Sequence, residues 1–172
     1  MIPEELAAAA EAQRASDYFR LEKIARDLIA SSTDAGDFAT LGNAYAYLGA
    51  ALVGFNDGPG ARAAFTRSQG YLERIGDEMG VVRALNGLAV AAMDLDLDAS
   101  TARSYIDVAL PVARRAIGGE RLWLGVLLGN RSEVERFDGD YRTAIASARE
   151  ALRILNELHE KARAGWQLTN IA

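Results

Sequence analysis

A repeat of about 41 residues is the feature that most constrains the fold of this chain. The triplet Ser16-Asp17-Tyr18 recurs as Gly139-Asp140-Tyr141, and the two aspartates lie three such periods apart. Each triplet precedes a stretch with small or apolar residues at offsets 0, 4 and 7, which share one helical face. Two similar stretches lie in between, so the four starts are 40, 41 and 42 residues apart: Leu21/Ala25/Leu28, Ala61/Phe65/Ser68, Ala102/Ile106/Ala109 and Ala144/Ala148/Ala151. Repeats of this length are typical of a stack in which each unit packs against its neighbours.

A second helical signature precedes each of the last three stretches and returns once at the end of the sequence. Its copies are Tyr45-x-x-Leu48-Gly49, Leu85-x-x-Leu88-Ala89, Leu128-x-x-Arg131-Ser132 and Leu168-x-x-Ile171-Ala172. A unit therefore consists of a helix A, a polar turn, a helix B and a short connector. Pro59 and Ser100 are placed to start a helix B, and glycines such as Gly76 and Gly118 are placed to end one.

These patterns predict an all-α fold with no β-sheet. We expect one repeat domain over residues 1–172, with units near 2–34, 35–76, 77–118 and 119–160 and a partial unit over 161–172. The expected helices are 3–15, 17–31, 36–54, 59–75, 78–94, 100–116, 120–137 and 141–158, with a ninth from about 161 onward. Pro111 lies inside the third helix B and removes one helical hydrogen bond, so a kink or break is expected near 107–111.

The sequence resembles the tetratricopeptide repeat family, whose pattern is W-x2-L-G-x2-Y followed by A-x3-F. The best-matching unit reads Tyr45-x2-Leu48-Gly49-x2-Leu52 and then Ala61-x3-Phe65. The next unit matches with one extra turn residue, and the fourth departs from the pattern because Arg131 and Glu135 stand where apolar residues belong. The long period is similar to that of repeats in large bacterial regulators, such as LuxR-type transcription factors and signalling ATPases. The resemblance implies a right-handed superhelical stack whose A helices line a concave face.

Composition argues against several classes of function. The 172 residues carry a net charge of −5 with Lys and Arg spread along the chain, which is not the pattern of a nucleic-acid binder. The longest apolar run, 44–55, is shorter than the roughly 20 residues that cross a membrane. The absence of cysteine and the acidic start, Met1-Ile2-Pro3-Glu4-Glu5, favour a cytoplasmic protein over an exported one.

No motif in the sequence indicates an enzyme, a cofactor or a metal site. His159 is the only histidine and stands in a polar run, so a solvated side chain is expected. Asp94-x-Asp96-x-Asp98 begins like a calcium loop, but Ala99 and Tyr105 replace the required glycine and glutamate. Gly58-Pro59-Gly60 lacks the lysine and hydroxyl of a phosphate-binding loop. We therefore interpret the last two as turns that lead into helices.

The candidate binding residues lie on the A helices. Asparagine is a mediocre helix former, yet Asn43, Asn86, Asn130 and Asn170 recur in similar places. On a concave face such amides could bond the backbone of an extended peptide, as the resemblance to peptide-binding repeats implies; alternatively, they bond neighbouring helices or water. The positions expected to face the same groove are Tyr47, Ala50, Arg83, Val90, Glu133 and Arg136. Trp123 and Trp166 are expected in the core.

The leading hypothesis is a non-catalytic scaffold that holds a peptide or protein partner in this groove. Two alternatives are a small-molecule sensor within a larger regulator and a self-association module. A peptide binder should show a long open groove with spaced amides, and a sensor one closed aromatic pocket. Because Trp166, Leu168 and Ile171 leave an apolar end without a following helix, we also expect either a longer stack or a homodimer through the C-terminal helix.

Overall fold

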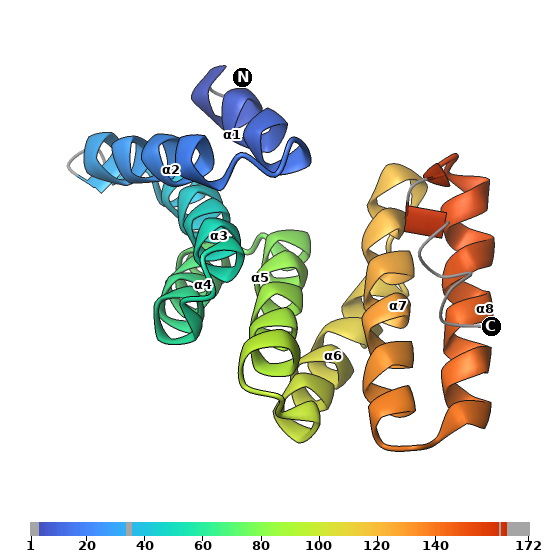
Figure 1. Ribbon diagram of the computed structural model, residues 1–172. Helices are drawn as coiled ribbons and strands as arrows, with labels where there is room; N and C mark the ends of the chain where they lie inside the picture. The colour runs from blue at the N-terminus through green and yellow to red at the C-terminus, as the bar shows by residue number, and fades with distance from the viewer. Residues whose placement is uncertain (1–3, 34–35, 162, 165–172) are drawn as a thin grey trace.

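Helices form all the regular structure in the described part of the chain, residues 4–33, 36–161 and 163–164 of the computed structural model (Figure 1). This confirms the predicted all-α class. The elements are α1 (Glu4–Arg14), α2 (Tyr18–Thr33), α3 (Phe38–Gly54), α4 (Gly58–Arg74), α5 (Glu78–Val90), η1 (Ala91–Leu95), α6 (Ala99–Ala113), η2 (Gly118–Glu120), α7 (Arg121–Phe137) and α8 (Tyr141–Glu157). The expected ninth helix, with Trp166 and Asn170, lies almost entirely outside the described residues, and so does the surface of the expected homodimer.

The sequence period corresponds to a repeated turn that starts each B helix. Asp57, Asp98 and Asp140 cap α4, α6 and α8, and in each case the carboxylate accepts a hydrogen bond from a backbone N–H three residues later. Asp17 accepts the equivalent bond at the start of α2. The residue before each aspartate has a positive φ: Ser16, Asn56, Leu97 and Gly139. A left-handed residue followed by a capping aspartate thus ends one helix and begins the next.

The same device starts two of the A helices. Asp37 and Asp77 cap α3 and α5 after Gly36 and Gly76, both with positive φ. Gly76 therefore has the predicted place at a helix end, whereas the prediction for Gly118 is wrong, because α6 already ends at Ala113 and Gly118 begins η2. In the third unit the start differs from the prediction, because Asp98 rather than Ser100 caps α6, which begins at Ala99.

The third unit contains the largest departure from regular helix. The helix expected over 78–94 is α-helical only as far as Val90 and continues as a π-helical turn, η1. A π turn accommodates one more residue than an α turn, and the sequence of this unit carries one extra turn residue. The insertion is therefore absorbed within the helix.

Pro111 lies inside α6 without breaking it, so of the kink or break predicted near 107–111 the break does not occur. The helix continues through the proline and ends at Ala113 instead of Ala116. Pro111 and Asp107 are both exposed, so the Asp107 carbonyl that loses its helical N–H partner can be hydrated. His159, expected to be solvated, is exposed and adopts a positive φ in the turn after α8.

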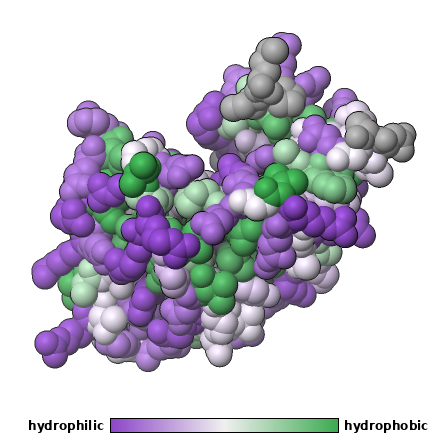
Figure 2. Space-filling model, turned by 180° about the vertical axis from the view of Figure 1, so that it is seen from behind, coloured by the Kyte–Doolittle hydropathy of each residue, from purple (hydrophilic) through white to green (hydrophobic). Residues whose placement is uncertain are grey.

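The helices pack in hairpins that follow one another along a curved row (Figure 1). Both α3 and α5 contact the B helix of their own hairpin, the preceding B helix and the next A helix, as α3 does with α4, α2 and α5. The main core runs from Ala61 and Phe65 of α4 to Ile154 of α8, and smaller clusters join α1, α2 and α3. Seen from behind, the space-filled outline is notched between the side of the last hairpin and the side of α1 and α2 (Figure 2).

Candidate functional site

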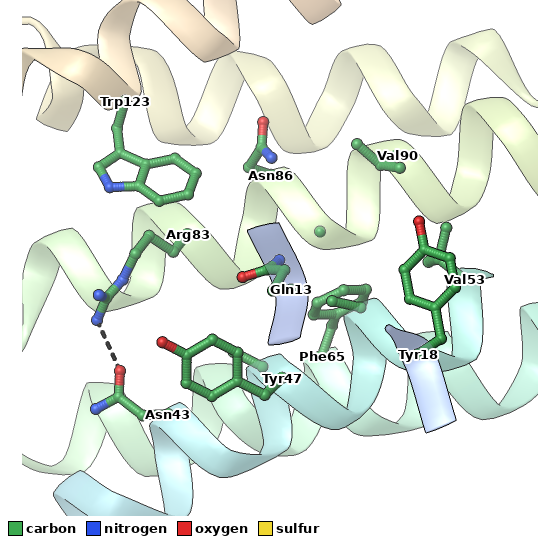
Figure 3. A pocket seen from close by; sticks show the side chains of 13 residues that line it. Gln13, Tyr18, Asn43, Tyr47, Val53, Phe65, Arg83, Asn86, Val90 and Trp123 are labelled. Atoms are coloured by element: carbon green, nitrogen blue, oxygen red, sulfur yellow. Dashed lines mark hydrogen bonds between the residues drawn. The ribbon is translucent and has the colours of Figure 1, made fainter. Parts of the chain in front are cut away.

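A cavity of about 420 Å³ lies where α1, α3, α5 and α7 converge (Figure 3). Several residues predicted for the groove line it: Asn43, Tyr47 and Ala50 from α3, and Arg83, Asn86 and Val90 from α5. Trp123, Asn86 and Val90 lie along one side, and Asn43, Tyr47 and Phe65 along the other. The predicted positions of two successive A helices therefore face one common space.

The floor of this cavity depends on Phe65, which is buried between α3 and α5. Its ring packs against two glycines, Gly49 of α3 and Gly87 of α5. A Cβ added to Gly49 would lie 2.7 Å from the ring, and one added to Gly87 would lie 2.3 Å from it. Both distances are shorter than any van der Waals contact, so glycine at these positions lets the ring reach the groove.

Arg83 is the cationic group of the cavity lining, and neighbouring side chains hold it in place. Its Nη2 donates a hydrogen bond to Asn43 Oδ1 at 3.1 Å and lies 3.5 Å from Asp77 Oδ2. Asn43 in turn donates from Nδ2 to the Ala39 carbonyl at 2.9 Å. The guanidinium remains partly exposed at the cavity edge, so it can still bind an anionic group.

Tyr47 gives the cavity a hydroxyl that keeps its proton. Partial burial raises the pKa of Tyr47 above its ordinary value, while the nearby charges of Arg83 and Arg14 act in the opposite direction. The phenol is therefore neutral at physiological pH and can donate a hydrogen bond to a ligand.

A smaller cavity of about 180 Å³ adjoins the first across Val90, which lines both. It brings together Asn130 and Glu133 of α7 with Met93 and Asp94 of η1. Asn130 donates from Nδ2 to Asn86 Oδ1 at 2.8 Å, so these amides link α7 to α5 while each borders a cavity. Both alternatives considered for the asparagines thus have support, since they bond neighbouring helices and also face the groove.

The second cavity is acidic. Partial burial raises the pKa of Asp94, and it also raises the pKa of Glu133, to which the negative charge of Asp94 adds while Arg136 opposes it. Neither carboxylate forms an ion pair or a hydrogen bond with another side chain among the residues that the structure describes. Arg136, also predicted for the groove, is exposed and lines neither cavity.

Sequence reasoning missed the part of the site that comes from outside the A-helix pattern. Gln13 of α1, Tyr18 of α2 and Phe65 of α4 also line the larger cavity. Trp123, predicted for the core, packs on the core with one part of its side chain and borders the cavity with another. The ring of Tyr18 packs against Gly54, where an added Cβ would lie 2.4 Å from it, a contact that only the structure reveals. Neither Tyr18 nor Gln13 carried a sequence signal for the cavity.

The motifs that resemble metal or phosphate sites have structural roles. In the Asp94-x-Asp96-x-Asp98 run, Asp94 borders a cavity, Asp96 pairs with Arg62, and Asp98 caps α6. Gly58-Pro59-Gly60 forms the first turn of α4. Within the described ranges, no three His, Cys, Asp or Glu side chains are grouped to hold a metal ion. No helix in the described part of the chain has the length and apolar character needed to span a membrane.

No protein-family model matches this chain, and no curated protein matches it significantly.

Proposed function

We propose that this chain is a non-catalytic, tetratricopeptide-like binding module that holds an extended segment of a partner protein in the groove formed by its A helices. The observation that carries the proposal is the pair of adjoining cavities, because together they extend the groove across α3, α5 and α7. Amides from each of these helices border it: Asn43, Asn86 and Asn130. An amide can both donate to and accept from a peptide backbone, which suits an extended ligand.

The larger cavity gives such a segment an anchoring point. Tyr47, Phe65 and Trp123 provide aromatic contact area, and a side chain buried there would be surrounded by apolar atoms. Arg83 and the Tyr47 hydroxyl supply polar contacts at the edge. This combination of one apolar anchor with flanking polar groups is common in sites that bind peptides tightly.

A second function has a specific observation in its favour. A cavity of about 420 Å³ with four aromatic side chains, Tyr18, Tyr47, Phe65 and Trp123, is also of the size and character that holds small molecules. The extension past Val90 into the second cavity favours the peptide, because a small molecule seated on Phe65 would have no use for Asn130 or Glu133.

The test is peptide selection followed by a matched pair of variants. A random peptide library displayed on phage is selected on the wild-type chain, and the affinities of the enriched peptides are measured by calorimetry. Replacing both Asn86 and Asn130 by alanine should weaken peptide binding by at least about tenfold. The melting temperature should stay nearly unchanged, because the two side chains are hydrogen-bonded to each other and both are removed.

The control is Asn156→Ala, which removes an exposed asparagine on α8 and should change neither quantity. Failure to enrich any peptide, or an Asn86/Asn130 variant that binds as well as the wild type, would contradict the proposed function. An Asn86/Asn130 variant that unfolds would show that the pair is structural.

A further inference from the structure

The two ends of the groove carry opposite charges. At the larger cavity Arg83 borders the space, and Arg14 is close enough to influence the ionisation of Tyr47. At the smaller cavity Asp94 and Glu133 border the space. Val90 and the Asn86–Asn130 hydrogen bond lie between the two ends. A ligand that spans the groove therefore meets a cationic edge, an apolar middle and an anionic edge in that order.

The cationic end is organised before any ligand binds. Asn43 Oδ1 accepts a hydrogen bond from Arg83 Nη2. Asp77 Oδ2 lies 3.5 Å from the same nitrogen, which is long for a strong ion pair. The side chain is about a third exposed, so it is accessible to an incoming carboxylate. A fixed guanidinium loses little side-chain entropy when it binds a planar acid.

The anionic end is only partly compensated by its surroundings, because neither Asp94 nor Glu133 forms an ion pair with the residues that the structure describes. The charged groups facing Glu133 are Asp94 from η1 and Arg136 one turn along α7. Asp96, close by in sequence, is already paired with Arg62 of α4. Two half-enclosed carboxylates next to each other repel, and a cation placed between them would relieve this repulsion.

We propose that the groove selects an extended peptide whose groove-facing side chains are acidic, apolar and basic in that spatial order. This inference rests on the proposed function and names the chemistry of its partner. The acid would bind Arg83, the apolar side chain would pack on Phe65 and Val90, and the base would bind between Asp94 and Glu133. Arg83 and Asp94 lie eleven residues apart along the continuous α5 and η1, which is roughly 16 Å at about 1.5 Å per residue. Alternate side chains of an extended chain share a face about 7 Å apart, so three of them span about 14 Å, and the long Glu and Lys side chains cover the difference. The matching pattern is therefore Glu-x-Leu-x-Lys, in either chain direction.

Three display libraries of equal size test this proposal in one selection. They share randomised x positions and a central Leu, Phe or Met, and they differ in their ends: Glu and Lys, Glu and Glu, or Lys and Lys. On the wild-type chain the library with opposite ends should be enriched about tenfold over the other two, which is the size expected for a pair of partly desolvated charge contacts.

Two variants should change the preference in opposite directions. Arg83→Glu makes both ends of the groove acidic and should favour the library with Lys at both ends. Asp94→Lys combined with Glu133→Lys makes both ends basic and should favour Glu at both ends. Arg83→Gln, which keeps a polar side chain beside Asn43 without its charge, should abolish the preference for Glu without creating one for a second Lys. Circular dichroism verifies that each variant is folded.

The outcomes separate this inference from the function on which it rests. Equal enrichment of the three libraries, with binding still lost in the Asn86/Asn130 variant, would leave the groove as a peptide site and overturn the charge order. A wild-type preference that Arg83→Gln and Arg83→Glu leave unchanged would also overturn it. Enrichment of no library would contradict both proposals.

Discussion

The second and fourth hairpins build the same interface with different chemistry. Between α3 and α4 the ring of Phe65 packs against Gly49, so a large side chain meets a small one. At the equivalent positions of the sequence repeat the fourth hairpin has Ser132 and Ala148, which are both buried and both small. In the fourth hairpin this interface contains Glu135, whose side chain is 1% exposed. The second hairpin has Leu52 at the equivalent position.

Hydrogen bonds compensate the burial of Glu135. Arg131 donates from Nε to its Oε1 at 2.8 Å, and the Ser147 hydroxyl donates to its Oε2 at 2.7 Å. The hydroxyl of Ser132 is buried nearby and lacks a hydrogen-bond partner in the part of the chain that the structure describes. The departure of this unit from the pattern of the second unit therefore leaves the hairpin packed, with a paired charge in place of an apolar contact. It also teaches that an apolar position of the sequence repeat can be filled by polar groups provided that they act together.

The largest expected effect is at the apolar interface. Phe65→Ala should lower the free energy of unfolding by about 3–5 kcal/mol, because the ring is buried between three helices and its loss leaves a cavity. Phe137→Ala is the matched control: that ring is 55% exposed, and its removal should cost about 0.5 kcal/mol or less. Urea unfolding followed by circular dichroism measures both. Similar losses in the two variants would show that Phe65 does not hold the second hairpin to the third.

Removing the buried charge of the fourth hairpin should cost less. Glu135→Ala should lower stability by about 2–3 kcal/mol, since Arg131 stays partly solvated but Ser147 loses its acceptor. Glu135→Leu combined with Ser147→Ala replaces the polar pair by an apolar one and should bring most of that stability back. If this double variant is as unstable as Glu135→Ala, the polar pair is needed for packing and the two hairpins are less alike than we infer.

Gly87, one of the two glycines that pack against the Phe65 ring, provides a test with an effect of intermediate size on stability. Gly87→Ala should lower stability by about 1–3 kcal/mol, because the new Cβ would force the Phe65 ring to move. Gly70→Ala, also inside a helix but with no atom within 4 Å of the added Cβ, should instead raise stability by about 1 kcal/mol. A gain in both variants, measured by thermal unfolding, would mean that the ring can be displaced at little cost.

The smallest effect concerns Glu133, which lies on the same helix as the paired Glu135 but forms no ion pair with the residues that the structure describes. Burial raises the pKa of Glu133 in the folded chain, so its ionisation destabilises the fold, and the cost grows as pH rises from about 4 through that raised pKa. Glu133→Gln should therefore stabilise the chain at pH 7 by about 0.5 kcal/mol, a figure kept small by solvent screening, and have no effect at pH 3. A stabilisation that is the same at both pH values would rule out this electrostatic origin.

Much of the fold could be predicted from the sequence because the repeated signals are local. The aspartates at 17, 57, 98 and 140 act on backbone groups three residues away, so their spacing alone locates four helix starts. The extra residue of the third unit is visible in the sequence, but the repeat pattern does not assign it to a π turn after Val90. The burial of Glu135 depends on its contact with Ser147 of the next helix, which no local pattern records. The predicted break at Pro111 does not occur for a related reason, because the cost of a helical proline depends on whether the carbonyl that it leaves unpaired, here that of Asp107, faces water.

The groove was predictable to the extent that it follows the helical period. Asn43, Tyr47, Arg83, Asn86 and Val90 share one cavity because they occupy matching faces of α3 and α5. Gln13 and Trp123 reach the same cavity from the first and fourth hairpins, and this depends on how strongly the row of hairpins curves. Curvature results from small rotations between successive units, which a single sequence does not encode in any one residue.

The central claim, that the A-helix groove is the binding surface, is tested most directly by mapping where a selected peptide contacts the chain. Backbone amide resonances are followed by NMR while a peptide enriched on the wild-type protein is added. We expect the largest shifts at Asn43, Tyr47, Arg83, Val90 and Glu133, on α3, α5 and α7. Shifts confined to the exposed apolar side chains near the A-to-B turns, Phe19, Leu97 and Phe137, would place the binding surface on that edge and contradict the account.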